Sequence, residues 1–162
     1  MKKIVFLFIL SNTFINCQSA PKTTFSKFAL DDKLEQMDGV SVNFADILEK
    51  HSGKPLFIDV WGSWCRDCIE SLPKFKAFQS DHQEMEYVFL SLDKTVKAWK
   101  KGVERFEIKG DHYFMSSGRK GPLGSFLDLD WIPRFLIVNP NGKIEVFRAI
   151  ETTDINLLNY LK

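Results

Sequence analysis

Residues 58–73 read I-D-V-W-G-S-W-C-R-D-C-I-E-S-L-P, and this stretch decides the fold. It continues an apolar run that begins at residue 56 and is bounded by turn residues, which is typical of a strand buried on both faces. Asp59 is the one charged residue of that run. After Cys68 the apolar residues recur every three positions, as on one face of a helix: Ile69, Leu72, Phe75 and Phe78. The sequence therefore predicts that Cys65 and Cys68 lie where a buried strand passes into a helix.

Cys65 and Cys68 have the spacing of a redox-active dithiol. A cysteine at the start of a helix lies near unpaired backbone N–H groups and the positive end of the helix dipole, and both stabilise a thiolate. The thiolate is the nucleophile of disulfide exchange, so we interpret Cys65 as the attacking residue. Cys68 lies one turn later on the same helix face, where it can attack the mixed disulfide and release the substrate.

Three other interpretations of the cysteine pair compete with redox chemistry. A zinc site needs a second pair of ligands, but there is no second C-x-x-C, and His51, His82 and His112 are isolated in sequence and interpreted as surface residues. A purely structural disulfide would close a loop too small to remove much chain entropy. Buried, unreactive cysteines do not normally stand at a strand-to-helix boundary. We therefore favour redox chemistry, with no metal and no cofactor.

Length and composition restrict the remaining possibilities. The chain has 162 residues and 18.8 kDa, room for one domain of ordinary size. Hydrophobic residues make up 44% and charged residues 27%, a balance that argues against disorder along most of the length. The formal net charge of +1 removes the usual electrostatic case for binding nucleic acid.

Strands and helices are predicted to alternate along the rest of the chain. We expect a strand-turn-strand unit around Asp38-Gly39 and a short helix over 44–50. The other expected elements are strands over 87–92, 134–138 and 143–149, helices over 95–108 and from 153 or 154 to 161, and a mostly loop segment over 110–124. This order predicts an α/β fold with a central mixed sheet and helices on both faces.

The first sixteen residues are predicted to be an export signal. A basic start at residues 1–3 precedes the apolar run 4–10, which is too short to span a bilayer stably. A buried first strand is the alternative. We expect export across the membrane of a bacterial cell.

A lipid anchor is predicted at Cys17. Phe14-Ile15-Asn16-Cys17 resembles the lipobox of bacterial lipoproteins, although Phe14 and Asn16 differ from its usual Leu and small residue. Simple cleavage after Ala20 is the alternative and fits its own pattern poorly. The expected organisation is a signal peptide over 1–16, a tether over 17–27 and a domain over 28–162.

The quoted segment resembles the active site of thioredoxin-fold proteins. Those proteins have an acid six residues before the first cysteine, a Trp directly before it and a Pro five residues after the second; here these are Asp59, Trp64 and Pro73. They also have a cis proline that faces the cysteines, and Ile132-Pro133 fits that position. The resemblance covers about residues 50–160. It implies a thioredoxin-like fold with an N-terminal extension.

Within this fold the chain is similar to exported thiol-disulfide oxidoreductases of the TlpA/ResA type. The 39 positions from Asp93 to Ile132 exceed what thioredoxin itself has there. The phrases F-L-S-L-D, A-W-K and W-I-P-R-F-L-I-V-N-P-N-G-K also resemble that group.

The resemblance implies a proton-transfer role for Asp59. A buried carboxylate resists ionisation, which suits a group that takes and returns protons near Cys68 through a water. The alternative is an Asp that reaches solvent at a strand end. Phe89 stands where thioredoxin has a Lys, so Asp59 is expected to lack a cationic partner.

The resemblance also implies a surface that receives the substrate. Pro133 has no N–H, so the edge beside it accepts substrate backbone without competition, and its ring keeps metal ions off the thiols. Trp64, Trp131 and Ile132 are candidates for substrate binding, whereas Trp61 belongs either to an apolar rim or to the core.

The implied function is the reduction of disulfides in exported proteins. The partners would be exported proteins with disulfides or dithiols and an upstream thiol electron donor. The lipid anchor would hold the protein in the cell envelope, facing the periplasm. Arg66 stabilises the Cys65 thiolate and Asp67 destabilises it. The reduced form is therefore stabilised less than the reduced form of a strong oxidant. A disulfide oxidase or isomerase, and a redox-inactive binding module, are the alternatives.

Overall fold

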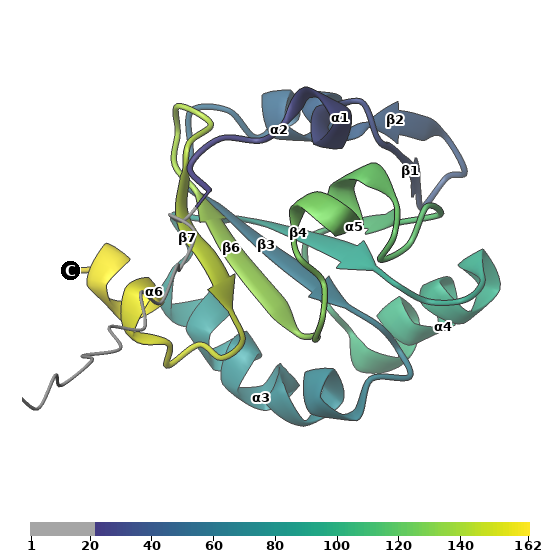
Figure 1. Ribbon diagram of the computed structural model, residues 1–162. Helices are drawn as coiled ribbons and strands as arrows, with labels where there is room; N and C mark the ends of the chain where they lie inside the picture. The colour runs from purple at the N-terminus through teal and green to yellow at the C-terminus, as the bar shows by residue number, and fades with distance from the viewer. Residues whose placement is uncertain (1–21) are drawn as a thin grey trace, which may run out of the picture.

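A computed structural model describes residues 22–162, which form one seven-stranded mixed sheet with helices on both faces (Figure 1). The strand order is β2-β1-β5-β4-β3-β6-β7. The strands are β1 (Lys33–Gln36), β2 (Ser41–Asn43), β3 (Leu56–Trp61), β4 (Glu86–Ser91), β5 (Asp111–Phe114), β6 (Arg134–Val138) and β7 (Ile144–Ala149). The helices are α1 (Lys27–Leu30), α2 (Phe44–Lys50), α3 (Arg66–Asp81), α4 (Val96–Phe106), α5 (Pro122–Phe126) and α6 (Ile155–Tyr160). The predicted α/β fold is confirmed.

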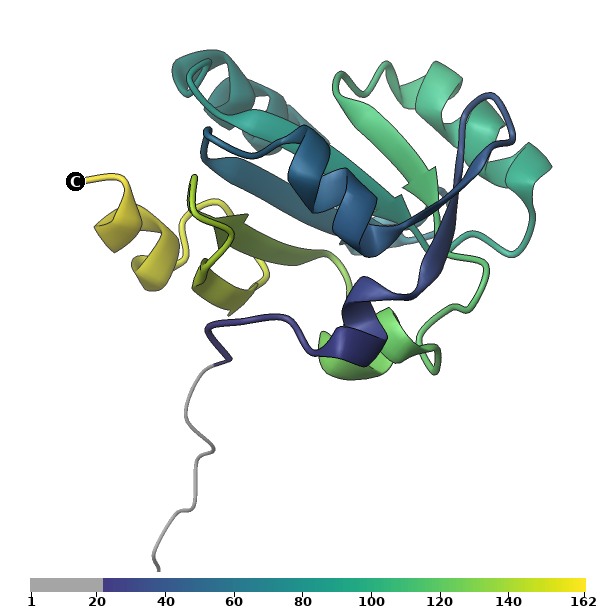
Figure 2. The ribbon, with the colours of Figure 1, turned by 90° about the horizontal axis from the view of Figure 1, so that it is seen from above.

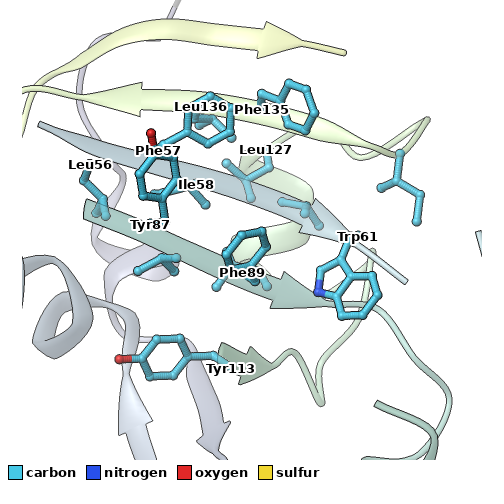
Figure 3. Close-up of a cluster of buried hydrophobic side chains, with 14 of the residues drawn as sticks. Leu56, Phe57, Ile58, Trp61, Tyr87, Phe89, Tyr113, Leu127, Phe135 and Leu136 are labelled. Atoms are coloured by element: carbon cyan, nitrogen blue, oxygen red, sulfur yellow. The ribbon is translucent and has the colours of Figure 1, made fainter. Parts of the chain in front are cut away.

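Strand β3 lies in the interior of the sheet, between β4 and β6, as its largely apolar run predicts. All six of its residues are buried, and it pairs in parallel with β4 and antiparallel with β6. Helices α3 and α4 lie on one face, and α1, α2 and α5 lie on the other (Figures 1 and 2). The first face is sealed by Phe75 of α3, whose ring lies 5.3 Å from Phe57, 5.5 Å from Phe89 and 6.1 Å from Phe135. Figure 3 shows these three strand residues side by side.

The N-terminal segment packs on the domain earlier in the chain than expected. The Phe25 ring lies 5.0 Å from Phe44 and 5.3 Å from Phe126, and Ile144 N–H donates to the Thr23 carbonyl. Residues 22–27, predicted to be tether, therefore lie against the domain, because Phe25 gains apolar contacts there. The predicted signal peptide, Cys17 and the first part of the tether lie outside the described residues.

The buried carboxylate of Asp32 joins the N-terminal extension to a distant segment. Asp32 Oδ2 accepts hydrogen bonds from Ser117 Oγ and from Leu123 N, both at 2.9 Å. The second bond satisfies an otherwise unpaired N–H at the start of α5. Helix α1 lies beside α5 in the same region (Figure 2). The N-terminal segment with α1 therefore packs against the segment with α5 that precedes β6.

Several sequence expectations need correction. Segment 110–124, predicted to be mostly loop, contains β5 and the start of α5; both are short, and its glycines hide their patterns. His112 and His51 are buried, not on the surface: His112 stacks on Phe89 at 5.0 Å, and His51 Nε2 lies 3.1 Å from Asp111 Oδ2. Contacts with residues distant in sequence, which local patterns do not reveal, bury both histidines.

Within residues 22–162 no helix is both long enough and apolar enough to cross a membrane.

Candidate active site

Cys65 and Cys68 lie at the junction of β3 and α3, as the sequence predicts. Cys65 is the N-cap residue of α3, and the two cysteines form a disulfide with their Cα atoms 5.3 Å apart. The Cys68 N–H points at Cys65 Sγ, 3.2 Å away. In the reduced state this N–H and the dipole of the sixteen-residue helix both favour a thiolate on Cys65.

The structure brings Ile132 and Pro133 to the cysteines, across 67 positions of sequence. The Ile132–Pro133 peptide bond is cis, and the Ile132 carbonyl oxygen lies 3.6 Å from Cys65 Sγ. Pro133 is buried directly before β6, the strand that pairs antiparallel with β3. The structure therefore places the Ile132–Pro133 peptide beside Cys65.

A cleft of about 300 Å³ opens beside Cys65. Its lining includes Trp64, Trp131 and Ile132, together with Arg66, Asp67, Arg119 and Asp130. Trp64 and Trp131 are 53% and 57% exposed, so both present apolar surface to solvent. Trp61 is buried against α4 and belongs to the core. Cys65 lines the cleft and Cys68 does not, although both residues are mostly buried in the disulfide state.

Asp59 lies on the face of β3 that α3 covers. Its side chain points to the same side as that of Phe57, two residues earlier, and Phe57 contacts Phe75 of α3. Asp59 is 5% exposed, and its Oδ1 has no hydrogen-bond partner among residues 22–162. Burial raises the pKa of this carboxyl well above its usual range.

The strand register shows what stands beside Asp59. Phe89 of β4 and Phe135 of β6 are its direct neighbours on either side. Phe89 therefore occupies the position at which thioredoxin would place its Lys. The neighbours are aromatic and offer the carboxyl neither a charge nor a hydrogen bond.

Asp93 is an important residue of the site that the sequence reasoning missed. Its buried carboxylate accepts hydrogen bonds from Ser63 N at 3.2 Å, from Ser63 Oγ at 2.5 Å and from Ser91 Oγ at 2.7 Å. Trp64 Nε1 also donates to the Leu92 carbonyl at 3.2 Å. These bonds fasten the loop before Cys65 to the end of β4. A Ser-x-Asp sequence at the end of a buried strand, here Ser91-Leu92-Asp93, is the signal that points to such an anchor.

A hollow wider than this cleft lies elsewhere. It has a volume of about 1060 Å³ and is lined by the carboxyl end of α3 and by the segments that follow α3 and α4, among them Lys76, Gln79 and Lys109. It contains no cysteine and none of the predicted site residues. The chemistry therefore points to the smaller cleft beside Cys65.

Comparisons with known proteins agree with this geometry. The family model described as thioredoxin-like matches residues 53–144. The chain is 26% identical over 174 residues to a thiol-disulfide oxidoreductase ResA of Bacillus cereus, covering 100% of this chain and 98% of that protein. It is 25% identical over 148 residues to ResA of Bacillus subtilis (strain 168), covering 87% and 77%. A thiol-disulfide oxidoreductase structure from Bacteroides fragilis NCTC 9343 superposes with a TM-score of 0.68 at 19% identity, covering 84% and 100%.

Replacing Asp59 with Asn is expected to stabilise the fold at alkaline pH. Because the folded-state pKa is raised, the folded wild type binds more protons than the unfolded chain, and its stability falls as pH rises from the unfolded pKa towards the folded one. Asn does not titrate, so its stability advantage over the wild type should grow steadily as pH rises from 4 to 8. Urea unfolding from pH 4 to pH 8 measures this difference.

The matched control is Asp38→Asn, which changes an exposed carboxyl in the turn between β1 and β2. Its effect should be nearly independent of pH. A difference between Asp59→Asn and the wild type that stays constant from pH 4 to pH 8 would contradict the assignment.

Proposed function

The chain belongs to the thioredoxin-like family and is a thiol-disulfide oxidoreductase, and we propose that it reduces disulfides in exported proteins. The observation that carries the proposal is the placement of Cys65. It caps the first turn of α3, lies beside the carbonyl of the cis Ile132–Pro133 peptide and lines an open cleft, whereas Cys68 lies outside that lining. We therefore expect exchange with a client to take place at the sulfur of Cys65, whether that sulfur attacks or is attacked.

The proposed reaction has two steps. The Cys65 thiolate attacks one sulfur of a client disulfide, forming a mixed disulfide while the other client sulfur leaves as a thiolate and takes a proton. Cys68 then loses its proton and attacks Cys65 Sγ, which releases the second client thiol. The protein ends with the Cys65–Cys68 disulfide and the client has gained two electrons. An upstream thiol donor restores the dithiol.

We propose that Asp59 accepts the proton that Cys68 loses in the second step. The carboxyl lies on the face of β3 beneath α3, and its raised pKa suits a group that accepts a proton near neutral pH. Its neighbours in the sheet are Phe89 and Phe135, so burial alone sets its proton affinity. Transfer through one water allows the carboxyl to act without touching the sulfur.

The client chain is proposed to bind across the cis-proline side of the cleft. Pro133 carries no N–H and leaves the neighbouring edge to the client backbone. Trp64 and Trp131 are the exposed aromatic residues of the cleft beside Cys65, and Ile132 belongs to the same lining. Large aromatic side chains of this kind contribute strongly to protein recognition.

The surroundings of Cys65 support a reductant over an oxidase. Arg66 Nε donates to Glu70 at 2.7 Å, so its positive charge is shared with an acid one turn away. Asp67 adds a negative charge in the first turn of α3. Weak stabilisation of the thiolate makes the dithiol a better electron donor. A protein whose cysteines rest as a permanent disulfide is the second candidate, and the experiments below separate the two.

We further propose export and anchoring through the N-terminal sequence. The signal over residues 1–16 would be removed, and lipid on Cys17 would hold the domain in the bacterial cell envelope, facing the periplasm. The partners would then be exported proteins with disulfides or dithiols, together with the membrane.

Cys68→Ala should trap client proteins on Cys65. The variant can form the mixed disulfide but cannot resolve it, so adducts should accumulate and be identifiable by mass spectrometry after non-reducing electrophoresis. Cys65→Ala is the matched control and should form none. Equal adduct yields from both variants would refute the assignment of Cys65 as the attacking thiol.

The direction of electron flow is tested by equilibrating the wild-type pair with glutathione. We expect a reduction potential well below about −200 mV, because the charges of Arg66, Asp67 and Glu70 offset one another and add little to the thiolate stabilisation that the start of α3 gives Cys65. A value near or above about −120 mV, the range of strong oxidants, would exclude the reductant role.

Cys17→Ser should release the protein from membranes without changing its activity, because the lipid is the proposed anchor and Cys17 takes no part in exchange. Fractionation of cells and an insulin-reduction assay on the purified protein measure the two effects. A variant that still fractionates with membranes would rule out the lipid anchor.

A further inference from the structure

We propose that Arg134 is a positioning residue that holds residues 127–133, here named the cis-proline loop, in the shape that receives the client chain. The inference rests on the proposed function, because it assigns a role in the same substrate-binding surface. Arg134 is the first residue of β6 and follows Pro133 directly.

The Arg134 guanidinium is buried inside the loop it follows. The residue is only 2% exposed. Its Nη1 donates to the Leu127 carbonyl at 3.3 Å and to the Asp128 carbonyl at 3.2 Å. Its Nη2 donates to Asp130 Oδ1 at 2.5 Å and, over a longer 3.4 Å, to the Trp131 carbonyl. One side chain therefore binds four residues of an irregular segment through two nitrogens.

An arginine is suited to this position by its shape and charge. Carbonyl groups that turn inward in a loop need donors, and a planar guanidinium offers several in fixed directions. Asp130 supplies the opposite charge, and the hydrogen bond from Arg134 lowers the pKa of that carboxyl. The backbone at Asp128 has a φ of 48°, in the left-handed region that few non-glycine residues adopt. The conformation of the cis-proline loop therefore depends on the hydrogen bonds from Arg134.

The loop carries the residues that meet the client, but Arg134 itself does not. Trp131 and Ile132 line the cleft beside Cys65, and Arg134 is not part of that lining. The Ile132 carbonyl, 3.6 Å from Cys65 Sγ, links the loop to the reacting sulfur. Loss of Arg134 should therefore weaken client binding and leave the thiol chemistry of Cys65 largely intact.

Arg148 provides a matched control. Its Nη2 donates to Asp130 Oδ2 at 2.8 Å, so it shares the carboxyl with Arg134. Its side chain is half-exposed, and it makes no hydrogen bond to the carbonyls of the cis-proline loop among the described residues. Arg148→Met and Arg134→Met each remove a positive charge beside Asp130, and Arg148→Met also removes a weaker ion pair with Asp128 at 3.8 Å. Only Arg134→Met removes the hydrogen bonds to the loop backbone.

The test compares a protein disulfide with a small one. With insulin as substrate, Arg134→Met should raise KM about tenfold or more and change kcat less than about threefold. The rate with oxidised glutathione and the pH profile of Cys65 alkylation should stay within about twofold of the wild type. Arg148→Met should leave every one of these quantities within about twofold. An unchanged insulin KM in Arg134→Met, or an equal loss with insulin and glutathione, overturns the proposal.

Arg134→Lys keeps the test decisive if the Met variant does not fold. Lys keeps the charge but has one nitrogen in place of the fork, so amide hydrogen exchange at residues 128–132 should accelerate about tenfold while β3 and β4 keep their protection. Uniform acceleration, or none, overturns the positioning role. A wild type that fails to reduce insulin while Cys65 alkylates normally refutes the proposed function instead, and the exchange measurement still decides the role of Arg134.

Discussion

The contact between the start of α3 and the cis-proline loop, made through Cys65, is the constraint on which the rest of the site depends. Cys65 Sγ lies 3.2 Å from the Cys68 N–H nitrogen and 3.6 Å from the Ile132 carbonyl oxygen. The sulfur is therefore activated by a helix and contacted by a loop that belongs to another part of the chain. Both must be held rigidly, because disulfide exchange needs the attacking and leaving sulfurs in line.

Two buried charged side chains provide that rigidity. Asp93 accepts hydrogen bonds from the loop before Cys65, and Arg134 donates to the carbonyls of the cis-proline loop. They support two different segments around the same sulfur and carry opposite charge. Charged groups are rarely buried without partners, and here most partners belong to a loop that forms the site. Asp59, also buried, differs because its neighbours in the sheet are aromatic.

The sequence predicts best what depends on local patterns. The apolar runs of β3, β4 and β6 and the C-x-x-C before an apolar helical face locate the sheet and the cysteines, and counting back from Asp93 places Phe89 beside Asp59. The roles of Asp93 and Arg134 escape such reasoning, because their partners are selected by folding and not by spacing. Strand β5 and helix α5 escape it for a related reason: both are short, and contacts from the N-terminal extension support them.

The bond network of Asp32 has a consequence for how such a protein can change over evolutionary time. Asp32 belongs to the N-terminal extension, and Ser117 and Leu123 belong to the segment before β6. Each segment therefore supplies hydrogen-bond partners that the other needs. A recombination event that exchanged one segment without the other would leave the Asp32 carboxylate without two of its donors, at a cost of about 1–3 kcal/mol for each lost hydrogen bond. The two segments should therefore be inherited as a pair, although about 85 residues separate them in the gene.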